Sequence, residues 1–454
     1  MNNIHAISPL DGRYASKVAA LSQYFSEKAL MHARCIIECW YILALDEHSI
    51  FEPLRPEDKN RIEQVIHFFS EEDYLSIKKI EETTHHDVKA CELFLQEKLS
   101  LPDNNIIHFG LTSEDINNLA HTYLLDAYLK KEQLPQLKSL MEKLGNLAND
   151  WKAIPFPART HGQKASPSTA GKELAVFLHR MGRVYKALNH FQFSGKLNGA
   201  VGNYSAMQAA VPSIDWHNFA ANFFKKHGFQ HNIATTQIED HDTWAAYFNL
   251  TRQLNNILID LDLDCWLYIS KELFFEKTKA GEVGSSTMPH KVNPINFENS
   301  EGNLLLSNSL LSMMSDKLCR SRMQRDLSDS TVERNFGVAL GHAYLGISET
   351  LRGLNKLQVN ENLCRAELEE SPELLTEPIQ TILRLAKVED PYNLLKQASR
   401  GKKIDKESLL NLVENLNIEP HFKTQIQQLK VVEYVGEAER ICDLVLNEIK
   451  EILS

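Results

Sequence analysis

The sequence contains 454 residues, of which 43% are hydrophobic and 24% charged, and this composition excludes disordered and collagen-like chains. Its 49 Lys and Arg residues against 60 Asp and Glu residues give a formal net charge of −11, so there is no diffuse basic field to hold nucleic acid or an anionic membrane. A polyanionic ligand would therefore have to bind a local cluster of cations. The length exceeds that of one ordinary domain.

Short helices are predicted in residues 1–110. The helical pattern of this segment is interrupted by prolines, at Pro53, Pro56 and Pro102, and proline ends or kinks a helix. We take this segment as the first of three predicted domains.

Long helices are predicted in residues 111–365, the second domain. Helical periodicity follows Ser113, Pro167 and Pro294. Residues 229–280 contain neither Gly nor Pro and predict one long amphipathic helix. The apolar positions of this helix recur at steps of three and four residues: Tyr247, Leu250, Leu254, Ile257, Leu261, Cys265 and Tyr268.

The third predicted domain, residues 366–454, begins where the helical pattern restarts near Pro372 and Pro378. Alternating β-branched runs between turn residues are rare in the whole sequence, so the predicted fold class is all-α. Long helices cannot bury their apolar stripes alone. We therefore expect a helical bundle that equivalent helices of other subunits join.

Seven cysteines are scattered along the chain without a C-x-x-C pair, which predicts reduced and mostly buried thiols. The N-terminus lacks a basic region followed by an apolar block, and no apolar run approaches the roughly 18 residues that a membrane span needs. We therefore expect a cytoplasmic protein without a membrane partner.

The sequence has no G-x-G-x-x-G, no Walker-type glycine loop and no H-E-x-x-H, so nicotinamide, P-loop and zincin chemistry lose their usual support. His85, His86 and Asp87 have three interpretations: metal ligands, a nucleotide-binding turn or a solvated helix start. Adjacent histidines project in different directions, and no other His or Cys nearby completes a site. We expect no metal and no cofactor.

Residues 281–298 are the most informative stretch of the chain. Two glycines, two serines and a lysine lie between positions 281 and 291. Asn293 is predicted as the N-cap and Pro294 as the first residue of a helix. The serines would then lie in a loop that leads into the positive end of that helix and can close over an anion. A plain Gly-Ser linker is the alternative.

The segment Gly284-Ser-Ser-Thr-Met-Pro-His-Lys-Val-Asn-Pro294 resembles the signature of the fumarase, aspartase and argininosuccinate lyase superfamily. Its Met-Pro-His-Lys form is similar to the adenylosuccinate lyases within that superfamily. The resemblance covers nearly the whole chain, and the other segments that carry it are Asp11-Gly-Arg-Tyr14, Thr84-His-His-Asp-Val88, Thr112-Ser-Glu-Asp-Ile-Asn-Asn118, Arg159-Thr-His-Gly-Gln163, Thr235-Thr-Gln-Ile238 and Gln324-Arg-Asp-Leu-Ser-Asp-Ser-Thr-Val-Glu-Arg-Asn335.

The resemblance implies an all-α, three-domain lyase fold with a long central bundle. In a homotetramer these bundles would form a core of about 20 helices, with active sites shared between chains. The implied reaction is β-elimination of fumarate from adenylosuccinate, giving AMP. The same site would release fumarate from succinyl-aminoimidazole-carboxamide ribotide (SAICAR), giving AICAR, in purine nucleotide biosynthesis.

β-Elimination requires a base for the proton next to a carboxylate, an acid for the leaving amine, and cations for the developing charge. The resemblance assigns the base to Ser285, with Ser286 as the rival position, and the acid to His161. A serine hydroxyl is a weak base, so the closed loop must supply N–H donors and the charge of Lys291. Imidazole, with an ordinary pKa of about 6.5, can hold and release a proton at neutral pH.

The resemblance also implies a set of substrate-binding residues. Arginine suits a phosphate, and hydroxyl groups at a helix N-terminus suit a carboxylate. Helix capping and surface ion pairs are the alternative explanations for several of these residues. The set comprises Arg13, Tyr14, His85, His86, Asp87, Thr112, Ser113, Gln237, Lys291, Asn293, Asn299, Arg325, Ser330 and Arg334.

Two residues depart from the family pattern. Lys164 stands where the family usually has Pro, which removes a rigid φ and adds a charge near His161. His85 stands where Asn or Arg is expected. One alternative function is another fumarate-releasing lyase, such as an argininosuccinate lyase or a cycloisomerase relative, and the phosphate-binding set argues against it. A non-catalytic helical structural protein is the other alternative, and the presence of Ser285 and His161 argues against that.

Overall fold

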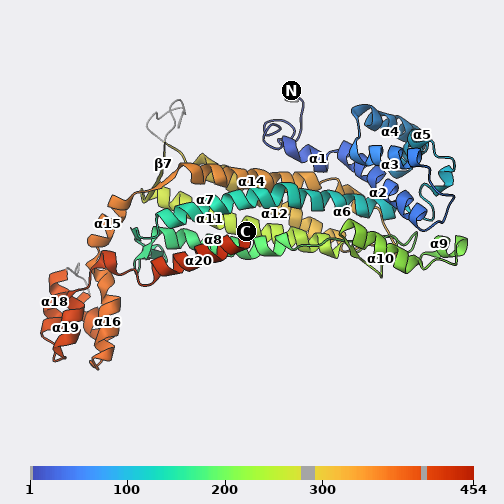
Figure 1. The fold of residues 1–454 in the computed structure, drawn as a ribbon. Coiled ribbons are helices and arrows are strands. Elements are labelled where there is room, and N and C mark those ends of the chain that lie inside the picture. The colour runs from blue at the N-terminus through green and yellow to red at the C-terminus, as the bar shows by residue number, and fades with distance from the viewer. Residues whose placement is uncertain (1–3, 278–291, 400–405) are drawn as a thin grey trace. The chain divides into compact units, whose positions relative to one another are not determined.

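A computed structural model describes residues 4–277, 292–399 and 406–454, and helices dominate these parts of the chain (Figure 1). The predicted all-α class is confirmed. Ser285, Ser286 and Lys291 lie outside the described residues. Of the helices in the described ranges, none is both long enough and apolar enough to cross a bilayer.

The chain divides into two compact units, each built from three stretches. Unit 1 comprises Met1–Leu137, Val184–Asn256 and Gly302–Ile347, and unit 2 comprises Lys138–Arg183, Ile257–Glu301 and Ser348–Ser454. Because the long helices contribute residues to both units, this division does not test the boundaries near 110 and 365, and the three domains stay a prediction. The helices that contribute to both units are α7 (Leu134–Asp150), α8 (Ala170–Asn189), α11 (Asp242–Ser270), α12 (Ile295–Leu318) and α14 (Phe336–Lys356).

The long helix predicted within residues 229–280 is α11. Five of its seven predicted apolar positions are buried, among them Leu254 at 1% exposure and Leu261 at 0%, and the other two, Leu250 and Tyr268, are partly buried. The helices predicted after Ser113, Pro167 and Pro294 are α6 (Ser113–Tyr128), α8 and α12. Polar pairs join the long helices inside each unit; in unit 2, Thr350 on α14 donates to Asp262 on α11 at 3.0 Å.

Two predicted helix starts are wrong by one to a few residues. Helix α12 begins at Ile295, and the carbonyl of Pro294 accepts from the N–H of Phe297 at 3.1 Å, so Pro294 rather than Asn293 occupies the cap position. Helix α8 begins at Ala170, and its capping oxygen is Thr169 Oγ1, which accepts from Lys172 N at 3.2 Å. The residues between Pro167 and α8 form a strand instead.

In unit 1 the helices α2 and α6 pack against each other. Apolar residues such as Ile37, Ile42 and Leu119 are fully buried in its core. The elements of this unit that lie outside the five long helices are α1 (Ser22–Phe25), α2 (Glu27–Glu47), α3 (Pro56–His67), α4 (Glu71–Thr84), α5 (Asp87–Leu99), α6, α9 (Ser205–Ala210), α10 (Trp216–His227), α13 (Ser328–Glu333) and the parallel strands β5 (Ser194–Gly195) and β6 (Gln230–His231).

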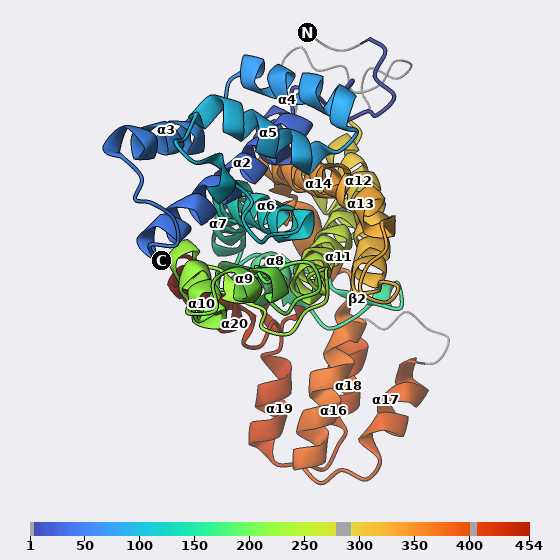
Figure 2. The same cartoon turned by 90° about the vertical axis from the view of Figure 1, so that its right-hand side faces the viewer.

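The described residues of unit 2 form three two-stranded antiparallel sheets and a cluster of short helices near the C-terminus. The helices α16 (Thr376–Leu385), α17 (Pro391–Ser399), α18 (Lys406–Glu414) and α19 (Pro420–Gln427) lie side by side in Figure 2 and share an apolar core that runs from Leu368 to Val431. The remaining elements are α15 (Glu361–Glu369), α20 (Ala438–Leu453), β1 (Pro155–Phe156) with β4 (Ser168–Thr169), β2 (Arg159–Thr160) with β3 (Gln163–Lys164), and β7 (Phe274–Glu276) with β8 (Leu357–Val359).

The seven cysteines agree with the prediction of reduced and mostly buried thiols. All seven are unpaired, six are buried, and Cys319 is exposed. Burial raises the pKa of the Cys364 thiol to about 12. Such thiols are poor nucleophiles, so they contribute packing rather than chemistry.

Candidate active site

Unit 1 contains a cavity of about 640 Å³ where four segments that are distant in the sequence meet. Nine predicted substrate-binding residues line it: His85, His86, Asp87, Thr112, Ser113, Gln237, Arg325, Ser330 and Arg334. The sequence missed four lining residues, Glu81, Asn117, Asp326 and Leu327. The cavity is lined by two guanidinium groups and several hydroxyl and imidazole groups, which suits an anionic ligand.

The turn between α4 and α5 forms one wall. His85 ends α4 with a left-handed backbone (φ 50°), and His86 caps α5 by accepting from Lys89 N at 3.2 Å through Nδ1. Asp87 accepts from Arg34 Nη2 at 2.8 Å and lies 3.5 Å from Arg334 Nη2. Burial opposes ionisation of Asp87, but the two arginines outweigh it and hold its pKa below the usual value.

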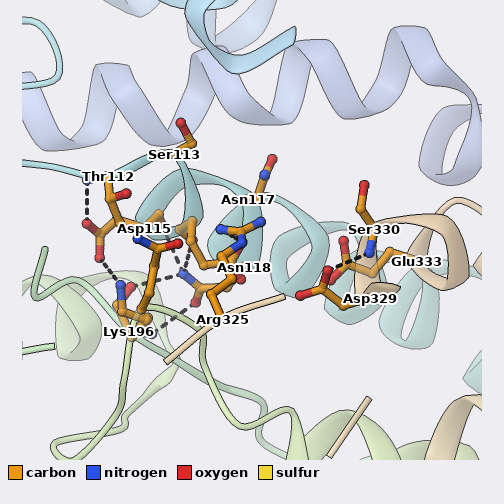
Figure 3. Close-up of polar contacts among 12 residues, drawn as sticks. Thr112, Ser113, Asp115, Asn117, Asn118, Lys196, Arg325, Asp329, Ser330 and Glu333 are labelled. Atoms are coloured by element: carbon orange, nitrogen blue, oxygen red, sulfur yellow. Dashed lines mark hydrogen bonds and ion pairs between the residues drawn. The ribbon is translucent and has the colours of Figure 1, made fainter. Parts of the chain in front are cut away.

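The N-terminus of α6 forms the second wall. Thr112 is the N-cap residue and Ser113 the first helical residue. The Thr112 N–H donates to Asp115 at 2.9 Å, and Asp115 also pairs with fully buried Lys196 at 2.7 Å (Figure 3). This buried network fixes the helix start, while Ser113 Oγ lies 3.5 Å from His86 Nε2 on the cavity side.

Residues around α13 form the third wall. Arg325, Ser330 and Arg334 line the cavity from this side. The side chain of Arg334 is 56% exposed and that of Arg325 is 18% exposed, so both remain accessible to a ligand. Gln237 joins them, and its Nε2 donates to Ala200 O at 3.0 Å. Two arginines beside a serine form a set that can hold a phosphate by charge-assisted hydrogen bonds.

Buried acidic side chains lie behind this wall, and the sequence analysis did not single them out. Glu114 is 1% exposed and Glu333 is 8% exposed. Burial and the nearby charge of Glu333 raise the pKa of Glu114 to about 8. Burial and the carboxylate of Asp329 raise the pKa of Glu333 to about 7. Glu114 lies in the first turn of α6, and its enclosure depends on the tertiary fold.

Among the described residues, one group of three side chains could hold a metal ion by distance: His241, Asp329 and Glu333, whose ligand-type atoms lie within 4.8 Å of one another. Asp329 already accepts from the Ser330 N–H at 2.7 Å. The two ring nitrogens of His241 lie 3.4 Å from Glu239 and 3.7 Å from Glu333, and neither has a hydrogen-bond partner among the described residues. We interpret the group as a cluster of buried ionisable side chains.

The predicted acid, His161, lies in unit 2 at the tip of the hairpin formed by β2 and β3. His161 and Gly162 both have positive φ, 54° and 74°, which is the backbone of a tight two-residue hairpin turn. The side chain is therefore presented at an exposed tip. The base of the hairpin is anchored to the segment after β8: Arg159 pairs with Glu367, and Lys164 donates to Ser371 Oγ at 2.7 Å.

The other predicted site residues that the structure describes do not line the cavity of unit 1. Tyr14 is fixed by its N–H, which donates to Pro9 O at 2.8 Å, and the Arg13 guanidinium lies 5.9 Å from the Tyr14 ring centre. Asn293 precedes α12 and Asn299 lies in its first turns, both in unit 2. The roles of all these residues stay predictions.

Comparisons with known proteins define the class of the molecule. A family model described as lyase matches residues 12–306, and one described as the adenylosuccinate lyase C-terminal part matches residues 321–435. A 3-carboxy-cis,cis-muconate lactonizing enzyme from Pseudomonas putida has a similar fold, with a TM-score of 0.74 and 19% identity over 96% of this chain and 98% of that one. A fumarate lyase from Mesorhizobium sp. BNC1 also has a TM-score of 0.74, with 17% identity over 94% and 97% of the two chains.

Curated relatives narrow the class further. Adenylosuccinate lyase of Escherichia coli K12 is 45% identical over 98% of this chain and 99% of its own length. The enzyme of Haemophilus influenzae is 44% identical over 96% and 98%, and that of Dictyostelium discoideum is 42% identical over 96% and 97%. The chain therefore belongs to the lyase family and, within it, to the adenylosuccinate lyases. It is an enzyme of the carbon–nitrogen lyase class.

Proposed function

We propose that the protein cleaves adenylosuccinate to AMP and fumarate, and SAICAR to AICAR and fumarate. The observation that carries this proposal is the cavity of unit 1, where Arg325, Ser330 and Arg334 lie opposite the N-terminus of α6. Both substrates carry a phosphate and a succinyl arm. The arginine wall suits the phosphate, and the hydroxyl groups of Thr112 and Ser113 at a helix N-terminus suit a carboxylate.

The proposed chemistry uses two proton transfers on opposite faces of the succinyl arm. Ser285 removes the proton next to the carboxylate, and His161 gives a proton to the departing amine. Lys291, Asn293 and Asn299 hold the carboxylate that gains charge in the transition state. The hairpin geometry supports the role of His161, because a tight turn presents the imidazole at an exposed tip instead of burying it.

The exposed position of His161 also supports the proposal of a shared site in a homotetramer. An imidazole at a hairpin tip in unit 2 can reach a substrate only if another surface completes the site around it. We propose that three chains contribute to each site, with a small-molecule substrate and no nucleic acid or membrane partner. The buried, unpaired thiols support a cytoplasmic setting.

Fumarate release from four candidate substrates tests the proposed function. The enzyme should release fumarate from adenylosuccinate and SAICAR, and much more slowly or not at all from argininosuccinate and aspartate. Turnover of a non-phosphorylated substrate alone would contradict the proposal and favour an argininosuccinate lyase.

Three variants test the proton-transfer roles. Ser285→Ala and His161→Ala should each lower kcat by at least about 100-fold, because each removes one proton-transfer group. Ser286→Ala is the matched control and should retain most activity. A large loss with Ser286→Ala and little with Ser285→Ala would move the base to the second serine.

A further inference from the structure

The guanidinium group of Arg325 contacts the buried carboxyl group of Glu114. Its Nη1 lies 3.3 Å from Glu114 Oε2, and the two side chains are 18% and 2% exposed. Neither Glu114 Oε1 nor Arg325 Nε has a hydrogen-bond partner among the described residues. Glu114 lies in the first turn of α6, and Thr112 and Ser113 at the same helix start line the cavity. The start of α6 therefore provides both cavity-lining hydroxyl groups and the carboxyl group that contacts Arg325.

Glu114 is surrounded by charge of both signs. Besides Arg325, the groups that act on it are Glu333 from α13, His241 at the start of α11, and Lys196 after β5. Lys196 is already paired with Asp115 at 2.7 Å. Arg325 is thus the cation that compensates Glu114 directly.

Glu333 is the second carboxyl of this buried group. It lies 3.6 Å from His121 Nε2 and 3.7 Å from His241 Nε2. Burial lowers the pKa of His121 to about 3, so this imidazole is neutral and does not compensate Glu333. The remaining charged groups that act on Glu333 are Asp329, Arg325, Arg34 and Arg334. Arg325 and Arg334 line the cavity, so a ligand there competes with Glu333 for their charge.

We infer that Glu114 is a positioning residue for Arg325, and that capture of the substrate's phosphate by Arg325 and Arg334 is accompanied by uptake of one proton from solvent into the Glu114–Glu333 pair. The inference rests on the proposed function. The phosphate dianion interacts with both guanidinium groups, so these groups stabilise the buried Glu114–Glu333 pair less. The dianion also adds negative charge close to that pair. One of the two carboxyls then binds a proton. This protonation removes the repulsion between the phosphate and that carboxyl, and it requires no movement of heavy atoms.

The direction of the pH dependence follows from linkage. A ligand that binds together with a proton binds more weakly as pH rises through the pKa of the group that takes the proton up. For this pair the range lies near pH 7 to 8. The second ionisation of a phosphate monoester, near pH 6, acts in the opposite sense and at lower pH. The two effects are therefore separable.

Calorimetric titration of the wild-type enzyme with AMP tests the proton uptake. A proton taken up on binding is released by the buffer, so the measured heat includes the ionisation enthalpy of the buffer. At pH 8, the heats of binding in PIPES and in Tris should therefore differ by about half to one times the difference between the ionisation enthalpies of the two buffers. Between pH 7.5 and 9 the Kd of AMP should rise by up to about tenfold per pH unit, the limit for one proton. Adenosine, which lacks the phosphate, should show neither effect.

Variants of Glu114 and Glu333 test whether the proton taken up on AMP binding is bound by these two carboxyl groups. Glu114→Gln keeps the shape and the hydrogen-bonding oxygen of a protonated carboxyl. It should bind AMP more tightly than wild type at pH 8.5 and equally at pH 6.5, and the double variant with Glu333→Gln should lose the buffer dependence. Glu114→Ala leaves Arg325 unsupported and should bind AMP more weakly at both pH values. Glu92→Gln, a mostly buried acid of α5 paired with Lys89, is the matched control and should behave as wild type.

The outcomes separate this inference from the proposed function. Turnover of adenylosuccinate and binding of AMP without buffer-dependent heat would overturn the proton uptake alone. Persistence of the buffer dependence in the double variant would assign the proton to another group and overturn it as well. Absence of both turnover and AMP binding in the wild type would overturn the proposed function together with this inference.

Discussion

Lys196 and Asp115 form the most deeply buried ion pair of the candidate site. Both side chains are 0% exposed, and Asp115 also accepts from the backbone N–H groups of Thr112 and Asn198. A buried pair of this kind is not a large net source of stability, because desolvation offsets the attraction. Removing one partner, however, leaves an uncompensated charge.

We predict that Lys196→Met destabilises the protein by about 3–5 kcal/mol, because Asp115 is left buried and unpaired. Urea unfolding followed by circular dichroism measures the change. The control is Lys226→Met, which breaks the exposed pair with Glu47 and should cost at most about 1 kcal/mol. Equal costs for the two variants would show that burial does not control the strength of these pairs.

The predicted binding residues and the buried residues beneath them differ in what the sequence can show. The family motifs placed His86, Thr112, Ser113 and Arg325 in one site, and the structure brings them to one cavity. Glu114 and Glu333 could not be found in this way. An acid in the first turn of a helix is explained by capping alone, and its enclosure depends on contacts between α6, α11 and α13 that no local pattern records.

At the scale of an element, helix α8 shows why boundaries are harder to predict than helices. The pair Ser166-Pro167 has the residue types of an N-cap and first turn. Residues Ser168–Thr169 instead pair with Pro155–Phe156 as β4 and β1, so the helix begins after them. Strand pairing with a distant segment outweighs the local preference.

We predict that Thr169→Ala weakens the first turn of α8 by about 1 kcal/mol, because Lys172 N loses its acceptor. Amide hydrogen exchange of residues 170–174 measures the effect, which should be local. Thr169→Ser is the matched control, since it keeps the capping oxygen. Faster exchange in the Ser variant as well would assign the effect to lost packing of the methyl group.

The C-terminal helices test the third predicted domain. Leu383 is fully buried in the core shared by α16, α17, α18 and α19. Helix α20 has different partners: Cys442 Sγ donates to Ala148 O at 3.5 Å, and Asp443 pairs with Lys152 at 2.7 Å. The predicted domain, residues 366–454, contains both groups of helices.

We predict that Leu383→Ala, which should cost about 2–5 kcal/mol, accelerates amide exchange in α16–α19 and leaves α20 unchanged. This result would end the third domain before α20. Faster amide exchange in α20 together with α16–α19 would instead support the predicted third domain, residues 366–454, which includes α20. Acceleration throughout the chain would contradict a separate C-terminal domain.

At the scale of the whole molecule, the buried acids link folding stability to pH. In the folded chain the pKa values of Glu114 and Glu333 are raised to about 8 and about 7. The ordinary value of a glutamate is about 4.3. A raised folded pKa means that the contribution of these groups to stability is fully present below that ordinary value and is lost as pH rises through the folded values.

We predict that the free energy of unfolding falls between pH 5 and pH 8.5 more steeply in the wild type than in the double variant Glu114→Gln/Glu333→Gln. Urea midpoints across this range measure the difference. Acids with lowered pKa values, such as Asp87 and Glu239, act below this range and are common to both proteins. Parallel pH profiles for the two proteins would contradict the assignment of these two pKa shifts.

The architecture could be predicted further than the assembly. Helical periodicity and the scarcity of strand patterns predicted an all-α chain, and the helices α6, α8, α11 and α12 are present in the predicted stretches, although α8 and α12 begin later than predicted. The proposed sharing of a site between chains depends on contacts between subunits, which a pattern in one sequence does not record.

The most direct test of the central claim is the crystal structure of the Ser285→Ala enzyme with adenylosuccinate bound. The phosphate should lie on Arg325, Ser330 and Arg334, and a succinyl carboxylate should lie at the N–H groups of Thr112 and Ser113. The imidazole of His161, from whichever chain supplies it, should lie within hydrogen-bond distance of the leaving nitrogen, with residue 285 on the opposite face of the substrate. A phosphate bound elsewhere, or His161 remote from the substrate in every subunit arrangement, would contradict the claim.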